Sequence, residues 1–152
     1  MAPPPVDYAH ATMSSASEES NRRLLRARDV MDGSYARPLD IPALARIAMT
    51  SEAHFSRTFK ATFGETPHRY LQRRRVERAM FLLRNTGRDV TEVCLDVGFS
   101  SLGTFSRTFR DIVGASPTEF RQQRAVAAVP SCFAMAWTRP SSFGEAGPGP
   151  RR

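Results

Sequence analysis

The pentapeptide Phe-Ser-Arg-Thr-Phe occurs at residues 55–59 and again at residues 105–109. The match continues in register, because Gly-Glu-Thr-Pro at residues 64–67 corresponds to Gly-Ala-Ser-Pro at residues 114–117, at the same offset of 50. A chance repeat of five residues would not extend through a glycine, a hydroxyl residue and a proline. The chain therefore contains one supersecondary unit that is used twice.

Each unit has the sequence pattern of a short helix, a turn and a second helix. In the first unit Asp40 is a suitable N-cap for the short helix, and the second helix begins near Ser51 and ends at Gly64 in the C-cap position. In the second unit Asp89 and Gly114 take the corresponding places. One side of the second helix is apolar in both units, with Phe55, Phe59 and Phe63 in the first and Phe105, Phe109 and Val113 in the second.

A longer helix is predicted between the two units. It begins at Thr66-Pro67, with proline in the first helical position, and runs to about Arg84. A further helix precedes the first unit, from about Glu18 to Gly33, and a short one follows the second unit. No short stretch alternates convincingly between apolar and polar residues, so we expect no strands. The predicted fold class is all-α, with two helix-turn-helix subdomains joined by a long central helix and about seven helices.

The composition divides the chain into three parts. Residues 1–16 are rich in proline, alanine and serine, and we expect them to form a disordered N-terminal arm. Residues 17–125 form the predicted helical domain, and residues 126–152, with four prolines after Val129, read as a flexible C-terminal tail. Within the domain we expect the first helix-turn-helix at residues 40–64, the central helix at 67–84 and the second helix-turn-helix at 89–114.

The chain is strongly basic. Its formal net charge is +7, and Lys60 is the only lysine among its 22 basic residues. A positive charge of this size is typical of proteins that bind a polyanion. Arginine also matches phosphate groups and guanine edges with two parallel hydrogen bonds. The arginine bias alone has a second explanation, because it can reflect the base composition of the genome.

Other kinds of site are disfavoured by the sequence. Cys94 and Cys132 show neither metal-ligand spacing nor a disulfide framework, so a reducing, cytoplasmic compartment is expected. His10, His54 and His68 are scattered, so we expect no metal site. No apolar run approaches the ~18 residues of a membrane span, and no catalytic constellation is present. We expect no membrane association, no cofactor and no enzymatic activity.

The second helix of each unit also has a polar side, which is the side a DNA-reading helix would turn toward the major groove. This side carries Ala53, Ser56, Arg57 and Lys60 in the first unit and Gly103, Ser106, Arg107 and Arg110 in the second. A solvated helix face with no partner is the alternative interpretation. Two copies with a matched arginine, at positions 57 and 107, favour DNA binding.

Residues 20–125 resemble the DNA-binding domain of the AraC/XylS family of bacterial transcription regulators. The second unit carries the resemblance best, in Val97-Gly98-Phe99-Ser100, Phe105-Ser106-Arg107-Thr108-Phe109-Arg110, Gly114-Ala115-Ser116-Pro117 and Phe120-Arg121. The resemblance implies a seven-helix fold of two subdomains joined by the central helix. It also implies binding to a bent or elongated DNA site at promoters, and contact with RNA polymerase.

The resemblance further implies which side chains read bases. By position these are Ala53, Ser56 and Arg57 in the first unit and Leu102, Gly103, Thr104, Ser106 and Arg107 in the second. Two of these depart from a polar reading surface, since Gly103 has no side chain and Leu102 offers only an apolar contact, such as one to a thymine methyl group. Our hypothesis is that base reading is concentrated in the first unit and that the second unit mainly positions the protein.

The turn of the first unit also departs from the family pattern. Met49 stands where the family commonly has glycine, and the offset from Asp40 to Asp89 is 49 rather than 50. The turn of the first unit is therefore expected to be one residue shorter than that of the second.

Five basic side chains are predicted to contact DNA phosphates: His54, Lys60, Arg73, Arg74 and Arg110. For the Arg73-Arg74-Arg75 run, structural ion pairing and plain solvation are alternatives to phosphate contact.

Taken together, the sequence predicts a bacterial transcription regulator that binds DNA in a sequence-specific manner. Because Glu52-Ala53-His54 differs from Leu102-Gly103-Thr104, the two units should read different bases, which favours a monomer on an asymmetric promoter site. We expect an activator that acts alone, because neither tail is long enough for an effector domain, and that is associated with the nucleoid in the cytoplasm. A nonspecific architectural DNA-binding protein and a protein-interaction helical module are the two alternatives.

Overall fold

The computed structural model describes residues 8–123, with side chains from Ser15 onward. This part of the chain contains seven helices and no strand, which confirms the predicted all-α class. The helices are α1 (Tyr8–Gly33), α2 (Ile41–Ile47), α3 (Glu52–Phe63), α4 (Pro67–Asn85), α5 (Val90–Asp96), α6 (Leu102–Val113) and α7 (Pro117–Gln122). The predicted tail at residues 126–152 lies outside the described residues.

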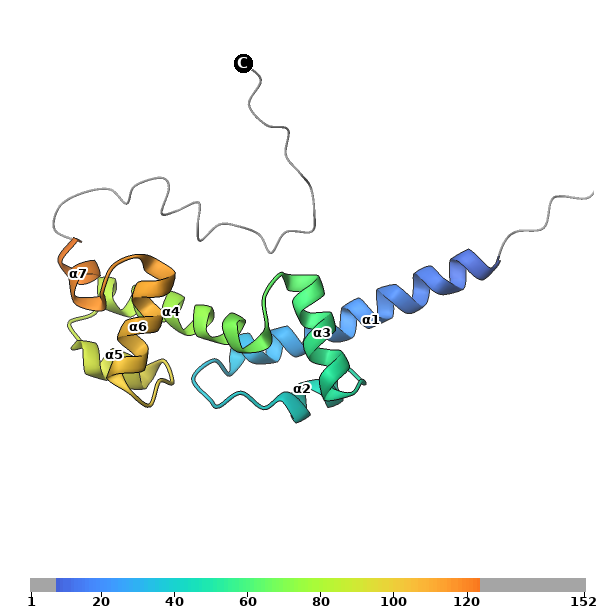
Figure 1. Ribbon diagram of the computed structural model, residues 1–152, viewed down its shortest axis with the longest axis horizontal. Coiled ribbons are helices and arrows are strands. Elements are labelled where there is room, and N and C mark those ends of the chain that lie inside the picture. Colours follow the sequence, from blue (N-terminus) through green and yellow to red (C-terminus); the bar gives the residue numbers. More distant parts are fainter. Residues whose placement is uncertain (1–7, 124–152) are drawn as a thin grey trace, which may run out of the picture.

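The two helix-turn-helix units lie at opposite ends of the central helix α4. Figure 1 shows α1, α2 and α3 gathered at one end of α4 and α5, α6 and α7 at the other. The first half of α1 projects away from the body of the molecule (Figure 1). This arrangement matches the predicted two subdomains on a long helix.

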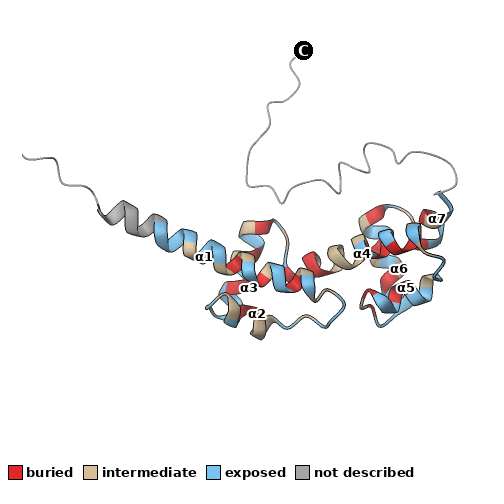
Figure 2. Cartoon of the chain, turned by 180° about the vertical axis from the view of Figure 1, so that it is seen from behind, coloured by how far each residue is buried: buried red, intermediate tan, exposed pale blue. Residues whose placement is uncertain are grey.

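Each subdomain has its own hydrophobic core, and α4 contributes to both. Tyr70 and Leu71, from the first half of α4, are buried with the phenylalanines of α3, whereas Val76 and Leu83 are buried with those of α6. Figure 2 shows the buried residues on the facing sides of these helices and mostly exposed residues in α1 between positions 15 and 22. The first core consists of Leu24, Ala27, Met31, Leu44, Ala45, Phe55, Phe59, Phe63, Tyr70 and Leu71.

Packed aromatic rings form the centre of both cores. Phe59 lies 4.6 Å from Phe63 and 5.5 Å from Tyr70, measured between ring centroids. In the second core Phe109 lies 5.6 Å from both Phe105 and Phe120. These separations fall in the range of favourable edge-to-face and offset contacts. The phenylalanines of the repeated pentapeptide are therefore the central core residues of each subdomain.

The helix boundaries follow from capping side chains. Ser51 and Ser101 accept hydrogen bonds from the backbone N–H groups at the third helical position of α3 and α6. Gly64 and Gly114 end these helices in the left-handed conformation, with φ of 77° and 86°. A capping box is present at the start of α7, since Ser116 and Glu119 each accept the other's backbone N–H.

One predicted boundary was wrong. Residues 8–16, expected to belong to a disordered arm, form the first turns of α1, which begins at Tyr8 rather than near Glu18. The chain contains neither proline nor glycine between Pro5 and Gly33, and the alanines in this stretch are strong helix formers. Residues 1–7 of the predicted arm lie outside the described residues.

The turns of the two units have the same hydrogen bonds at an offset of 49. The N–H of Met49 donates to the carbonyl of Arg46, and that of Gly98 to the carbonyl of Leu95. Both turn residues have positive φ, 55° for Met49 and 96° for Gly98. Met49 thus occupies a conformation that usually favours glycine. The second turn is longer by Ser100, as the sequence offset predicted.

Gly98 also lies against the first subdomain. A Cβ atom at this position would lie 2.5 Å from the carbonyl oxygen of Ala36, which belongs to the loop between α1 and α2. Gly114 has a similar φ, but no atom lies within 4 Å of its hypothetical Cβ. The two glycines therefore share a backbone conformation and differ in their surroundings.

We predict that Gly98→Ala destabilises the protein more than Gly114→Ala does. Both variants carry the cost of a left-handed backbone, about 1–2 kcal/mol. Gly98→Ala adds a backbone overlap with Ala36, of about 1–3 kcal/mol. Urea unfolding followed by circular dichroism measures the difference, and equal losses of unfolding free energy would contradict the close contact.

Candidate nucleic-acid interface

The second helix of each helix-turn-helix unit, α3 or α6, is the one that would enter the major groove, and we call it the recognition helix. The two recognition helices expose the same positions. The burial class of each residue from 51 to 65 is identical to that of its counterpart from 101 to 115. Arg57 and Arg107 are exposed on the polar sides of their helices, while Ser56 and Ser106 are partly buried. The two helices therefore expose equivalent positions and differ in the side chains that occupy them.

The charges on these surfaces are available to a partner. Among residues 15–123, Arg57, Lys60 and Arg107 make no ion pair. Arg110 lies 3.4 Å from Glu119, and both side chains are more than half exposed, so this pair is weak. A phosphate group could replace Glu119 as the partner of Arg110 at little cost.

The first turns of α3 and α6 differ in chemistry. Ala53 and His54 are exposed in α3, and Leu102 and Thr104 are exposed in α6. The hypothetical Cβ of Gly103 has only the Ser101 hydroxyl nearby, at 3.7 Å. The surface of α6 thus has an apolar side chain and an empty position where α3 is more polar.

Glu52 is a candidate that the sequence reasoning missed. It is exposed in the first turn of α3, at the position that corresponds to Leu102 in α6. A carboxylate there can accept a hydrogen bond from the amino group of cytosine. The repeat offset of 50 could have identified it, because Leu102 was already among the predicted base-reading residues.

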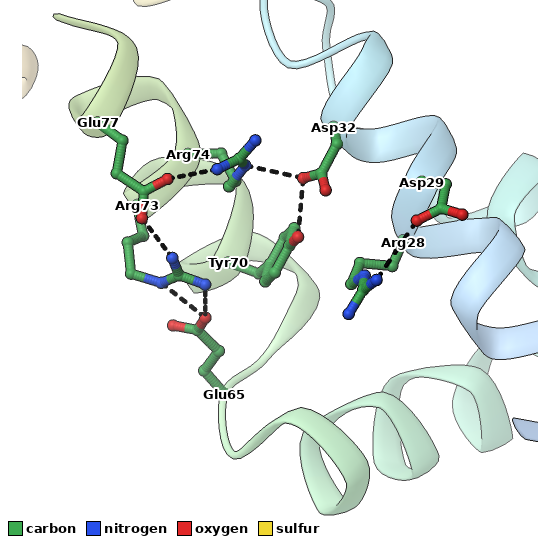
Figure 3. A network of polar contacts seen from close by, with 8 residues as sticks. All are labelled: Arg28, Asp29, Asp32, Glu65, Tyr70, Arg73, Arg74 and Glu77. Carbon is green, nitrogen blue, oxygen red and sulfur yellow. Dashed lines mark hydrogen bonds and ion pairs between the residues drawn. The ribbon is translucent and has the colours of Figure 1, made fainter. Parts of the chain in front are cut away.

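Arg73 and Arg74 are engaged within the protein. Arg73 donates to Glu65 at 2.7 and 2.9 Å and to Glu77 at 2.5 Å, and Arg74 donates to Glu77 at 2.6 Å. Arg74 also donates at 2.8 Å to Asp32, which accepts a second hydrogen bond from the Tyr70 hydroxyl (Figure 3). This network ties α4 to α1 and to the turn that follows α3.

The electrostatics of this network agree with a structural role. Burial alone would lower the pKa of the Arg73 guanidinium, but the hydrogen bond with Glu65 and the nearby carboxylates outweigh burial and raise it. Burial, with the hydrogen bond to Asp32, raises the pKa of the Tyr70 hydroxyl. We therefore propose the structural alternative for Arg73 and Arg74 in place of the predicted phosphate contact.

The described residues offer little support for other kinds of site. No group of three or more histidine, cysteine or acidic side chains in them could hold a metal ion. Cys94 is buried, and burial raises the pKa of its thiol, so it is unreactive. No helix between residues 8 and 123 is long and apolar enough to cross a membrane.

Comparison with known proteins agrees with this geometry. A family described as a helix-turn-helix domain matches residues 44–123, which is more than half of the chain. A solved transcriptional regulator with an AraC-type DNA-binding domain, from Chromobacterium violaceum, superimposes with a TM-score of 0.65 at 32% identity, over 72% of this chain and 97% of that one. The chain belongs to the AraC-type helix-turn-helix family of transcription regulators. This family is not enzymatic.

Two further relatives extend the comparison. The DNA-binding domain of AdpA, a global transcriptional factor solved in complex with a target DNA, superimposes with a TM-score of 0.63 at 30% identity, over 67% of this chain and 93% of that one. A helix-turn-helix transcriptional regulator of Haemophilus influenzae is 38% identical over 61 residues, which are 40% of this chain and 20% of that protein. The match thus spans about a fifth of the length of this Haemophilus influenzae protein.

We predict that Arg73→Met lowers the stability of the protein and removes no contact with a DNA phosphate. Removing the Arg73 guanidinium leaves Glu65 and Glu77 without the cation that they share. This change lowers the free energy of unfolding by about 1–3 kcal/mol. The slope of log affinity against log salt concentration should stay at the wild-type value, whereas Arg110→Met, at a predicted phosphate contact, should reduce it by about 1. A reduced slope for Arg73→Met would restore the phosphate assignment.

Proposed function

We propose that this chain binds an asymmetric promoter site as a monomer and activates transcription there through contact with RNA polymerase. The observation that carries the proposal is the pair of equivalent, exposed arginines, Arg57 and Arg107, on two recognition helices of one body. They keep their charge unneutralised in a protein that pairs many of its other arginines. An exposed cation on a recognition helix is suited to phosphate or guanine contact.

The two recognition helices have different roles in this proposal. Ala53, Ser56 and Arg57 read bases through α3, with Glu52 as an added candidate, and His54 and Lys60 contact phosphates beside them. The second helix contacts bases through Leu102, Thr104, Ser106 and Arg107 and phosphate through Arg110. Because α6 presents a leucine and a glycine where α3 presents an acid and an alanine, most discrimination belongs to α3.

The asymmetry of the two helices supports the monomer. A single copy already carries two recognition helices, so it does not need a second copy to occupy two major grooves. A dimer would favour a palindromic site, whereas one body with two different helices favours a directional one. Size-exclusion chromatography of the complex with one site would give a ratio of one protein to one DNA. A protein of this kind acts where the DNA is, in the bacterial cytoplasm.

Competition between the protein's mapped DNA site and random DNA tests the proposed function itself. A specific regulator should bind its mapped site about 10³-fold or more tightly than random DNA. Equal affinity for random DNA would indicate an architectural DNA-binding protein instead. Complete absence of DNA binding at ~50 mM salt, where phosphate contacts are strong, would favour a protein-interaction module and contradict the proposal.

We predict that Arg57→Ala reduces discrimination between bases, while Arg110→Ala weakens binding to all sequences by a similar factor. A bidentate base contact contributes about 1–3 kcal/mol of discrimination, and a phosphate contact contributes none. The affinities of both variants for the mapped site and for random DNA give the result. If Arg57→Ala lowered the two affinities equally, the base-reading assignment would be wrong.

A further inference from the structure

Arg75, in the middle of α4, joins the two subdomains through its guanidinium. Its Nε donates to the backbone carbonyl of Tyr35 at 2.6 Å, and its Nη2 donates to the carbonyl of Arg37 at 2.7 Å. Both carbonyls belong to the loop between α1 and α2, in the first subdomain. The same guanidinium lies 5.7 Å from the ring centroid of Phe99, which is buried in the core of the second subdomain.

The loop between α1 and α2 contacts the second subdomain directly as well. The side chain of Tyr35 is partly buried and packs against both hydrophobic cores. Next to it, the backbone of Ala36 lies so close to Gly98 that a Cβ there would be 2.5 Å from the Ala36 carbonyl oxygen. Gly98 is the turn residue of the second helix-turn-helix, so the first subdomain meets the second immediately before α6.

An ion pair makes a third link. Arg69, in the first turn of α4, lies 2.8 Å from Asp111, in the last turns of α6. Both side chains are substantially exposed, so this link contributes less than Arg75 does. Two of the three links start from α4 and two involve the loop between α1 and α2, and together they act on the orientation of one subdomain relative to the other.

We propose that Arg75 is a positioning residue, which fixes the separation and relative rotation of the recognition helices α3 and α6 by holding the loop at residues 34–39 against both subdomains. We call this set of contacts, formed by Arg75, residues 34–39, Phe99 and Gly98, the inter-subdomain latch. The role of the latch in DNA recognition rests on the proposed function, whereas its effect on the subdomain orientation does not.

The chemistry of Arg75 fits such a role better than a local one. Burial lowers the pKa of its guanidinium, which means that the charge is placed there at a cost. A helix-stabilising arginine would keep its charge in water or pair within its own helix, as Arg78 does over the ring of Phe81 at 4.9 Å. Arg75 instead binds two carbonyls that lie 38 and 40 residues away in the chain.

The geometry of DNA explains why the orientation matters. Successive major grooves on one face are ~34 Å apart, so one base pair changes the distance between two sites by ~3.4 Å and rotates them by about a tenth of a turn. A rigid body with two recognition helices matches one spacing. A body whose subdomains turn freely matches several spacings, with a lower effective concentration at each.

Distance measurements without DNA test the latch itself. Nitroxide labels are placed on Ala61→Cys in α3 and Thr118→Cys in α7, both exposed, in a Cys132→Ser background in which Cys94 is buried and stays unlabelled. Pulsed electron paramagnetic resonance should give one narrow distance distribution. Arg75→Met should broaden or split it, and Arg78→Met, which changes an exposed arginine over the Phe81 ring on the same helix, is the matched control.

Binding to sites of altered spacing tests the consequence. We expect the insertion of one base pair between the two half-sites to lower wild-type affinity about tenfold, and to lower the affinity of Arg75→Met by roughly threefold or less. Affinity for an isolated α3 half-site should be equal in both proteins. A merely structural role would lower all three affinities together and leave the spacing ratio unchanged.

Further variants keep the proposal falsifiable if Arg75→Met folds poorly. Arg75→Lys keeps the charge but loses the guanidinium fork whose Nε and Nη2 reach the two carbonyls, so it should give intermediate values. Asp111→Ala removes the Arg69 link from an exposed position. Distance distributions as narrow as the wild type in both Arg75 variants would overturn the latch, and broadening in Asp111→Ala alone would assign the orientation to the Arg69 link instead. A broadened distribution with an unchanged spacing ratio would overturn the positioning role. If the wild type held no specific site, the proposed function would fail, and the label distances would still decide about the latch.

Discussion

A single helix, α4, takes part in two separate hydrophobic cores, and the placement of both recognition helices depends on this. Tyr70 and Leu71 are buried against the phenylalanines of α3, and Val76 and Leu83 are buried against those of α6. The 19 residues of α4 extend over ~29 Å, at 1.5 Å per residue. Since packed cores tolerate little displacement, the direction of each recognition helix is determined by its own core. The relation between them is then left to α4 and to the contacts that cross between the cores.

The arginines of α3 and α6 and of the run at residues 73–75 fall into two groups: some bind groups within the protein, and others are exposed and make no ion pair among the described residues. Arg73 and Arg74 are bound to carboxylates, and Arg75 is bound to carbonyls, so all three hold parts of the protein together. Arg57 and Arg107 are exposed and make no ion pair among residues 15–123. A net positive charge therefore overstates the surface that is available to DNA. Arg57, Lys60 and Arg107 place part of the available charge on α3 and α6, where a polyanion could contact it.

Much of the fold could be predicted from the sequence because its signals are local. The doubled pentapeptide, the capping serines and the glycine C-caps lie within a few residues of the structure that they determine, and they predicted the helices correctly from α2 to α7. The start of α1 was predicted wrongly, because serine-rich composition was given more weight than the absence of proline and glycine between Pro5 and Gly33. Composition is an average over a segment, whereas the position of a helix end depends on individual residues such as proline and glycine.

The roles within the arginine run could not be predicted, because the partners are distant in the chain. Arg74 binds Asp32, and Arg75 binds the carbonyl of Tyr35, across separations of 42 and 40 residues. No periodicity or spacing within α4 identifies which of three adjacent arginines will face a carboxylate, a carbonyl or solvent. The repeat does not help either, since an offset of 50 from Arg75 reaches Ala125, beyond the second unit's last described helix. The contacts between the two subdomains therefore have no counterpart in the repeat.

This difference between repeated and unrepeated parts bears on how the domain reads DNA. Duplication supplied two equal scaffolds, as the identical burial of residues 51–65 and 101–115 shows, but two equal scaffolds joined by a flexible linker would have no fixed direction on DNA. Direction requires different chemistry on the two helices, which Glu52 and Leu102 provide. It also requires a fixed relation between them, which only contacts outside the repeat can provide. On the proposed asymmetric site, such a rigid, asymmetric body would face one way along the promoter, and the rest of its surface would meet the transcription machinery in one orientation.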